Sequence, residues 1–289
     1  SLPGYHRPTT VKEALDLKKR FPEAPFIAGA TELAVLFNKR HERHSAFISL
    51  EEIPELHVIS STDTEWRIGA AARLTDVADA LKGEYTALHA MLRLFASRQI
   101  RHRATLGGNL VTASPIGDSA PVLLALDARL ILRGSGERSV PIDQFFSGYR
   151  ETVMEPEELL TQICLPRSLA GETRFYKVSK RREMDISTVS AAIRLATDEA
   201  GLITEARLAY GGVAATPCRA NETDALLLGK PWGKADAPEI LETLADEFTP
   251  TDELRGSSDY RTGLITDLFR KYLAGEEDVI EAPSASPFQ

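Results

Sequence analysis

The sequence predicts a mixed α+β fold organised in two domains. Its 289 residues exceed what most single hydrophobic cores accommodate, so two domains are expected. In the first half, short apolar runs alternate with helical patterns, whereas in the second half strand patterns come first and helical patterns follow. The change lies near Pro166 to Gly171, a stretch rich in turn formers that we interpret as a linker.

Composition limits the classes of partner. The net charge of −8 comes from 34 basic and 42 acidic residues, which argues against nucleic acid, because phosphate binding needs an excess of Lys and Arg. No apolar run reaches the roughly 18 residues of a membrane helix. The N-terminus lacks the blocks of a secretory signal, so we expect a cytoplasmic protein. The first residue is not Met, which favours a piece of a longer protein over a separate subunit.

The cysteines and histidines predict no metal site in this chain. Cys164 and Cys218 are the only cysteines, and two distant thiols cannot hold an iron–sulfur cluster or a thiol-based zinc ion. They are expected to be free thiols in a reducing cytoplasm. Six histidines are scattered, and even His41 and His44 lack convergent carboxylates, so surface positions are expected.

The N-terminal elements are well signalled. Thr10 to Glu13 fits a capping box, and the helix that it starts should stop at Phe21-Pro22. Pro25 to Ala28 reads as a buried strand leading into a turn of small residues at 29–32, and a helix continues through 33–37. This segment is therefore a strand, a small-residue turn and a helix.

The remaining elements follow from apolar periodicity and turn residues. In the first half we expect strands at 47–50, 57–60, 66–69, 129–133 and 158–165, a hairpin turn at Asp63, helices at 74–82, 86–98 and 120–126, and a glycine-centred loop at 105–118. In the second half we expect strands at 175–178, 189–193 and 202–210, a hairpin turn at 198–201, helices at 222–229, 237–248 and 259–273, and a disordered tail over 276–289.

Two segments contain the residues suited to ligand chemistry. In the turn from Ala28 to Leu33, small residues let the backbone approach a ligand, and successive N–H groups can form an anion-binding concavity. The alternative is a tight turn without function. The second segment runs from Thr105 to Asn109, where paired glycines permit positive φ and close approach.

Polar residues after the second segment could contact a nucleotide. Asn109, Thr112 and Ser114 offer donors to phosphate or to a ring, and Asp118 could accept from ribose hydroxyls. The segment is neither GxGxxG nor GxxxxGK[ST], so a Rossmann fingerprint and a P-loop are both excluded. A pyrophosphate site and an ordinary polar loop remain equally open.

Together these strings resemble the flavoproteins of the molybdenum hydroxylase family. TLGGNLVTASPIGDSAP, preceded by SRQIR, looks like that family's second flavin-binding segment, and PFIAGATEL looks like the first. FSGYR at 146–150, YKVSKR at 176–181 and YGGVA at 210–214 also match, so the resemblance spans about residues 5–275. It is closest to the flavin part of bacterial xanthine dehydrogenase small subunits.

The resemblance implies a domain organisation. A vanillyl-alcohol-oxidase-type (PCMH-type) FAD-binding domain is expected over residues 1–168, with subdomains at about 1–54 and 55–168. A smaller α+β domain, like the C-terminal domain of CO dehydrogenase flavoproteins, is expected over 172–275. The family's complete fused subunits begin with a cysteine-rich ferredoxin-like domain, and this chain begins where such a domain would end.

The resemblance also implies a set of FAD-binding residues. Phe95 and Leu160 would pack on the flavin or adenine side, and Lys177 would lie near the ring. Ala30 departs from the family's usual glycine or small polar residue, and if its φ must be positive, alanine costs on the order of 1 kcal/mol. The implied residues are Phe26, Ile27, Ala28, Gly29, Ala30, Thr31, Glu32, Leu33, Phe95, Ala104, Thr105, Leu106, Gly107, Gly108, Asn109, Thr112, Ser114, Asp118, Leu160 and Lys177.

A charged loop follows Lys177. It contains Lys180, Arg181, Arg182, Glu183 and Asp185, and in the family it lies beside the flavin. Its charges, those of Lys180 and Arg181 above all, could tune the flavin and favour NAD or oxygen as acceptor. The alternative is a solvated basic turn. Met184 stands where the family commonly has an acidic residue, so an acidic gating role is not expected.

The implied function is electron relay. In the family, substrate is hydroxylated at a molybdopterin cofactor, and electrons pass through [2Fe–2S] clusters to FAD and then to NAD. The molybdopterin and the clusters would belong to partner domains or subunits. Xanthine or hypoxanthine is the expected substrate of the whole enzyme. The alternatives are a flavin subunit for CO, an aldehyde or an aryl-CoA, and a non-catalytic FAD-holding assembly scaffold.

Overall fold

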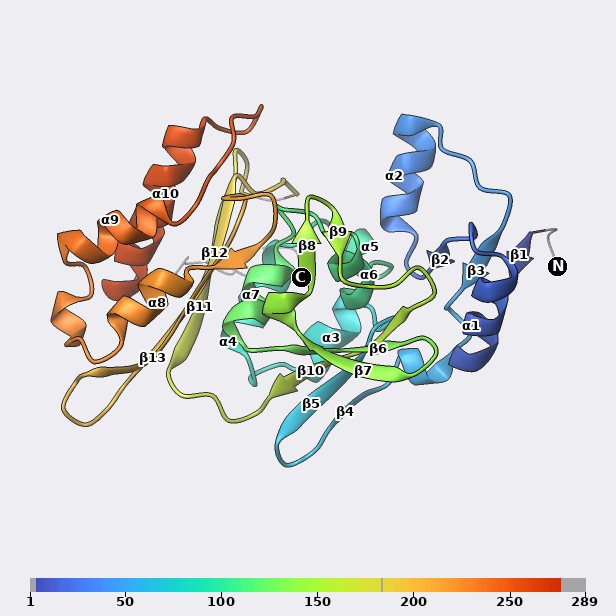
Figure 1. The fold of residues 1–289 in the computed structure, drawn as a ribbon, viewed down its shortest axis with the longest axis horizontal. Helices are drawn as coiled ribbons and strands as arrows, with labels where there is room; N and C mark the ends of the chain where they lie inside the picture. Colours follow the sequence, from blue (N-terminus) through green and yellow to red (C-terminus); the bar gives the residue numbers. More distant parts are fainter. Residues whose placement is uncertain (1–3, 183, 277–289) are drawn as a thin grey trace, which may run out of the picture.

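A computed structural model describes residues 4–182 and 184–276, and it confirms the mixed α+β fold. Three layers follow each other along the chain, and Figure 1 shows them side by side, from the N-terminal layer on the right to the C-terminal sheet on the left. Position 183 of the charged loop and residues 277–289 of the predicted tail lie outside the described residues.

The N-terminal layer is a small parallel sheet with strand order β1–β3–β2. Its elements are β1 (Tyr5–His6), α1 (Val11–Arg20), β2 (Phe26–Ile27), α2 (Thr31–Arg40), β3 (Phe47–Ser49) and a 3-10 turn (Pro54–Leu56). α1 begins as predicted, because the Thr10 side chain accepts a hydrogen bond from the Glu13 amide. It buries three side chains, whereas α2, all 10 residues of which are described, buries none.

The central layer is a five-stranded antiparallel sheet covered by helices. Its strand order is β4–β5–β10–β6–β7, and β6 alternates buried residues with exposed or half-buried ones, as a strand with one covered face should. The strands are β4 (Ile59–Ser61), β5 (Glu65–Gly69), β6 (Arg129–Arg133), β7 (Glu137–Pro141) and β10 (Leu159–Pro166), and the helices are α3 (Leu74–Ala80), α4 (Thr86–Leu94), α5 (Arg98–Arg101), α6 (Leu106–Val111) and α7 (Ser119–Ala125). A 3-10 turn (Ile142–Gln144) and a hairpin of β8 (Phe146–Gly148) and β9 (Glu151–Thr152) follow β7.

The C-terminal layer is a four-stranded antiparallel sheet in the order β11–β12–β13–β14. Its strands are β11 (Glu172–Val178), β12 (Val189–Thr197), β13 (Ile203–Gly211) and β14 (Cys218–Arg219), and α8 (Asn221–Leu227), a 3-10 turn (Trp232–Lys234), α9 (Pro238–Asp246) and α10 (Ser258–Leu273) follow. Tyr176, Ala191 and Tyr210 pack in a core with α8, α9 and α10. Phe175 and Ala192 face the opposite way and join the central core. The sheet is therefore buried on both sides.

The predicted turn between β12 and β13 is confirmed. Asp198 accepts hydrogen bonds from the amides of Ala200 and Leu202, at 3.0 and 2.9 Å, and Gly201 has φ +76°. Aspartate and glycine thus supply the side-chain acceptor and the positive φ that a tight turn requires.

Several boundaries were predicted wrongly. The helix expected over 86–98 ends at Leu94, because Ala96 takes a φ of +43° and a separate short helix, α5, follows. The segment 105–118 was expected to be a loop, but it contains helix α6, whose N-terminus is capped by Thr105. β1, β7, the β8–β9 hairpin and β14 were not predicted, since each is short or follows no clear alternation.

Candidate cofactor-binding cleft

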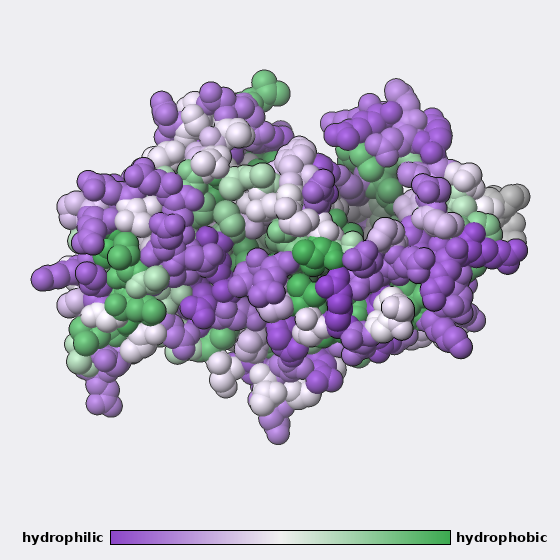
Figure 2. Space-filling model, in the orientation of Figure 1, coloured by the Kyte–Doolittle hydropathy of each residue, from purple (hydrophilic) through white to green (hydrophobic). Residues whose placement is uncertain are grey.

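A cleft of about 1050 Å³ lies where the three layers meet. Figure 2 shows it as a hollow between the part that carries α2 and the part that carries α10. Ligand sites typically measure about 300–1,000 Å³, so the cleft is large enough for a dinucleotide. The predicted residues that line it are Phe26, Ala28, Gly29, Ala30, Thr31, Glu32, Leu33, Phe95, Ala104, Thr105, Gly107, Gly108, Asn109, Thr112, Ser114, Asp118, Leu160 and Lys177.

Four of the predicted residues do not line the cleft. Ile27 pairs with Ser49 in the parallel sheet, and Leu106 is fully buried in the central core. In the charged loop, Lys180 donates to the Leu254 carbonyl at 2.7 Å, and Arg181 pairs with Asp185. These side chains therefore have structural contacts of their own.

The first segment forms the turn between β2 and α2. Ala30 caps the helix in the left-handed region, with φ 60° and ψ 5°, and its side chain accepts no hydrogen bond from the first turn. The backbone amides in the first turn of α2 therefore receive no hydrogen bond from the N-cap side chain. The residues of this turn line the cleft. A helix N-terminus of this kind attracts anions through its N–H groups and its dipole.

Gly29 serves packing rather than an unusual backbone angle. A Cβ placed there would lie 2.0 Å from the carbonyl oxygen of Arg103. Only glycine therefore lets the turn between β2 and α2 approach the residues that precede α6. This contact brings the turn of β2–α2 against residues 103–104, just before α6.

The paired glycines of the second segment act differently from expectation. Neither Gly107 nor Gly108 has a positive φ, because both lie in α6. A Cβ at Gly107 would lie 2.6 Å from both the Cβ and the carbonyl oxygen of Ala70, so this glycine packs against the central core. A Cβ at Gly108 would meet only the Thr105 hydroxyl oxygen, at 2.8 Å, and otherwise extend into the cleft. Gly108 thus leaves backbone open to a ligand, as a phosphate-binding segment requires.

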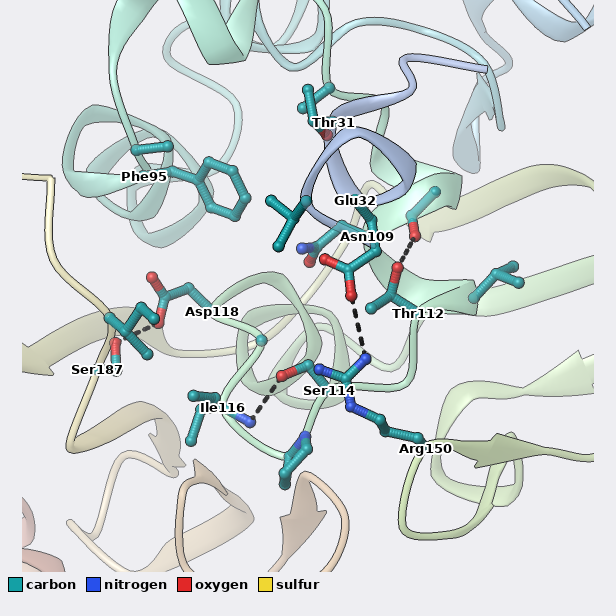
Figure 3. Close-up of a pocket in the computed structure, with 18 of the residues that line it drawn as sticks. Thr31, Glu32, Phe95, Asn109, Thr112, Ser114, Ile116, Asp118, Arg150 and Ser187 are labelled. Atoms are coloured by element: carbon teal, nitrogen blue, oxygen red, sulfur yellow. Dashed lines mark hydrogen bonds and ion pairs between the residues drawn. The ribbon is translucent and has the colours of Figure 1, made fainter. Parts of the chain in front are cut away.

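The polar side chains around α6 are partly engaged locally. Thr112 donates its hydroxyl to the Gly108 carbonyl at 2.9 Å, and Ser114 accepts from the Ile116 amide at 3.4 Å. The Asn109 amide oxygen accepts from Ser119, which leaves the amide nitrogen as the group available to a ligand. Figure 3 shows Asn109, Thr112 and Ser114 around the same cavity.

Asp118 joins the central layer to the C-terminal layer. Its carboxylate accepts from the Lys177 ammonium at 2.7 Å and from the Ser187 hydroxyl. The side chains of Asp118 and Lys177 are only 8% and 4% exposed. A buried ion pair with an added hydrogen bond holds this wall of the cleft in a defined position. The role expected for Asp118, an acceptor for ribose, competes with these two donors.

Of the wall that the C-terminal layer provides, sequence reasoning predicted Lys177 on β11 but missed other residues. The C-terminal layer contributes Gly212, Glu253 and Arg261 to the lining. The Arg261 guanidinium, 2% exposed, pairs with Glu253 and donates to the carbonyls of Thr188 and Gly212, at 2.6 and 2.7 Å. The glycine pair at 211–212 was the available signal, whereas nothing in the sequence distinguishes Arg261 from a surface arginine.

Arg150 was also missed as a lining residue. It lies in the β8–β9 turn with φ 57°, and its Nη1 is 3.1 Å from Glu32 Oε1 on α2. The hydrogen bond to Glu32 raises the pKa of the guanidinium. Figure 3 shows this pair meeting inside the cavity.

No thiol or metal cluster belongs to the cleft in the described part of the chain. Burial raises the pKa of Cys164 and raises that of Cys218 to about 12, so both thiols stay protonated at neutral pH. Within residues 4–182 and 184–276, no three His, Cys, Asp or Glu side chains are grouped as metal ligands. The same residues include no helix with the length and apolar character that crossing a membrane requires.

The sequence matches proteins of known family. Residues 2–168 match the family described as FAD binding domain in molybdopterin dehydrogenase, and residues 174–275 match the CO dehydrogenase flavoprotein C-terminal domain. The chain is 33% identical to a xanthine dehydrogenase and 36% identical to a nicotinate hydroxylase, both of Emericella nidulans. These alignments cover 97% and 93% of this chain but 22% of each relative, so the chain spans about a fifth of their length.

The structure is also similar to a solved carbon monoxide dehydrogenase chain from Hydrogenophaga pseudoflava. The TM-score is 0.87 at 28% identity, and the match covers 92% of this chain and 94% of that chain. Fold, cleft and sequence therefore agree. The chain belongs to the family of FAD-binding domains of molybdopterin dehydrogenases and is a flavin module of the molybdenum hydroxylase type.

Proposed function

We propose that this chain binds FAD in the described cleft and relays electrons from iron–sulfur clusters to NAD in a xanthine dehydrogenase. The observation that carries the proposal is the meeting of two glycine-bearing segments, β2–α2 and α6, on one cleft of dinucleotide size. Their backbone amides suit a pyrophosphate, and the apolar side chains of Phe95 and Leu160 suit a planar ring.

The chain's own residues would hold and orient the cofactor. The uncapped first turn of α2 and the open backbone at Gly108 would bind the pyrophosphate, and Lys177, fixed by Asp118, would place a positive charge near the ring. When bound, FAD supplies the conversion between single electrons and a hydride. The protein's contribution is to set position and electrostatics.

The other redox groups would lie on partners. The chain holds two cysteines, too few for a cluster, and it spans about a fifth of its xanthine dehydrogenase relative. Iron–sulfur and molybdopterin domains or subunits would therefore complete the enzyme in the cytoplasm. They would oxidise xanthine or hypoxanthine to urate with water and pass the electrons here.

A related substrate is the main alternative. Identity to the nicotinate hydroxylase is 36% against 33% for the xanthine dehydrogenase, and the fold matches a carbon monoxide dehydrogenase chain. Substrate is selected at the molybdenum site, so a flavin module serves CO, aldehyde or aryl-CoA oxidation equally well. A non-catalytic FAD-holding scaffold is the alternative from a different class.

The test begins with the absorption spectrum of the purified chain. We expect an oxidised flavin spectrum, directly or after incubation with excess FAD, and bleaching by NADH without oxygen. A chain that stays colourless after reconstitution would refute FAD binding. Bound FAD that NADH leaves oxidised would favour the scaffold or another acceptor. Xanthine-dependent NAD reduction should appear only when the iron–sulfur and molybdopterin partners are added.

A further inference from the structure

The helix α2 is a wall of the cleft that the rest of the protein holds only lightly. None of its residues is buried, although Leu33 and Val35 line the cleft. Val35 is 46% exposed at the edge of this cavity. A helix that buries no side chain gains little from packing, and such elements belong to the least stable part of a protein.

Both ends of α2 lie at residues with left-handed backbone angles. Its N-cap Ala30 has φ 60° and its C-cap His41 has φ 54°, and neither is a glycine. Left-handed angles are uncommon for such residues. Hinges are typically a few element-terminal residues that absorb large changes in φ and ψ. A rotation of α2 would therefore be taken up at Ala30 and His41.

One ion pair joins α2 to the opposite side of the cleft. Glu32 on its first turn meets Arg150 at 3.1 Å, across 118 positions of sequence. Arg150 extends from the β8–β9 turn, which follows the fully buried Phe145 of the central core. In Figure 3 the two side chains meet with Asn109 of α6 and Thr112, which directly follows that helix, beside them. One partner of the pair is thus anchored and the other lies on a lightly held helix.

We propose that α2 is a hinged wall and that the Glu32–Arg150 ion pair is a strap that keeps it closed over the bound dinucleotide. This inference rests on the proposed FAD site. The strap opens when the cofactor enters or leaves and closes again behind it. Because the two side chains are 43% and 39% exposed, salt weakens the attraction between them.

FAD release rates test the strap. FAD is loaded onto the chain, an excess of an apo-flavoenzyme captures the FAD that is released, and the activity that this enzyme regains reports the release rate. We expect Glu32→Gln and Arg150→Met each to speed release about two- to five-fold at low salt, the range of one exposed ion pair. The double variant should match the singles. High salt should speed release from the parent toward the rate of the variants.

The control is Arg133→Met. Arg133 is also about 40% exposed and ion-paired, with Glu55 and Glu137, but it lies outside the cleft lining. Its release rate should equal that of the parent. Unchanged release in Glu32→Gln, or additive effects in the double variant, would overturn the strap. So would tighter FAD binding by Glu32→Gln, which would mark Arg150 as a direct ligand of the phosphates.

A second measurement needs no cofactor. Spin labels at Lys39→Cys on α2 and Ser147→Cys on β8, both exposed positions, report the distance across the strap. We expect a narrow distribution in the parent at low salt and a broad one at high salt or in Glu32→Gln. Identical distributions would overturn the hinged wall. If the chain fails to bind FAD, the proposed function is refuted. The distance measurement still tests whether the Glu32–Arg150 ion pair holds α2 in place.

Discussion

At Ala30 the backbone adopts a left-handed conformation with a residue that has a Cβ. The related family usually has a glycine or a small polar residue at this position. The structure shows that the φ of Ala30 is positive. The neighbouring Gly29 has an ordinary φ and is needed instead for its contact with Arg103. The chain therefore places its glycine where space is short and an alanine where the angle is strained.

We expect Ala30→Gly to raise the free energy of unfolding by up to about 1 kcal/mol, because glycine relieves the left-handed strain. FAD should bind at least as tightly, since no ligand-facing side chain beyond one methyl is lost. Urea unfolding and FAD titration measure both. Ala28→Gly is the control: its φ is not positive, so stability should fall. Equal changes in the two variants would contradict the strain argument.

At the scale of elements, α6 shows how tertiary contacts override local propensity. Two adjacent glycines favour a loop, yet the Thr105 cap and the packing of Gly107 on Ala70 form a short helix. The two glycines consequently have separate tasks. Gly107 allows the helix to approach the core, and Gly108 keeps its cleft side free of a side chain.

We expect Gly108→Val to abolish FAD binding while the C-terminal layer stays folded, because the new side chain would extend into the cleft. Gly107→Ala should instead lower stability, because its Cβ would collide with Ala70. FAD titration and urea unfolding of both variants distinguish the tasks. Tight FAD binding by Gly108→Val would show that this backbone is not the phosphate cradle.

The sequence predicted those structural features that depend on residues close together in the chain. The α1 cap at Thr10 and the Asp198 turn follow from nearby residues, and they were predicted. The two glycine-bearing segments were also singled out, although the helix within the second was not predicted. The wall built by Arg150, Gly212 and Arg261 was not, because tertiary contacts alone bring these residues to the cleft. The same reason applies to Asp118, whose pairing with Lys177 joins residues 59 positions apart.

A contact between α8 and β13 predicts that the free energy of unfolding depends on pH. Asp224 on α8 is 9% exposed and accepts from the Leu208 amide of β13 at 2.9 Å. Burial raises its pKa to about 7, against the lowering effects of that amide, Arg219 and Arg207. A carboxyl group whose pKa is higher folded than unfolded stabilises the fold in its protonated form. This contribution is complete below about pH 4 and is lost as the pH rises to about 7.

We expect Asp224→Asn to remove this dependence, because asparagine stays neutral and keeps the acceptor for Leu208. Relative to the parent, the variant should gain stability on the order of a few kcal/mol between pH 4 and 7. Urea unfolding across that range measures the difference. The exposed Asp246→Asn serves as control. A parallel pH profile for parent and Asp224→Asn would contradict the assignment.

At the scale of the whole molecule, one carboxylate fastens the central layer to the C-terminal sheet. Asp127, just after α7, accepts from Arg194 at 2.6 Å, from Arg207 at 3.0 Å and from Arg219. Arg194 is fully buried and also donates to the Ala125 carbonyl at 2.9 Å. Since Asp118 at the other end of α7 pairs with Lys177, both ends of this helix are fixed to the C-terminal layer.

We expect Asp127→Asn to lower the free energy of unfolding by about 1.5–3 kcal/mol, the value of hydrogen bonds to a charged group. Asparagine tolerates the φ of 52° at this position, so the effect reports the lost charge. In single-tryptophan variants, the fluorescence of Trp66 in β5 reports unfolding of the central layer, and that of Trp232 after α8 reports unfolding of the C-terminal layer. Their transitions should coincide in the parent and separate in Asp127→Asn, and coincident transitions would contradict a coupling role. Asp143→Asn, a more exposed partner of Arg219, is the control.

The cleft draws its walls from nearly the full length of the chain, from Phe26 to Arg261. During synthesis, the ribosome releases α2 and α6 long before β13 and α10 exist to close the opposite side. A nascent chain is therefore expected to hold the dinucleotide firmly only once the segment as far as α10 has emerged and folded. Cofactor capture is therefore expected late in the synthesis of this segment, whatever sequence follows it.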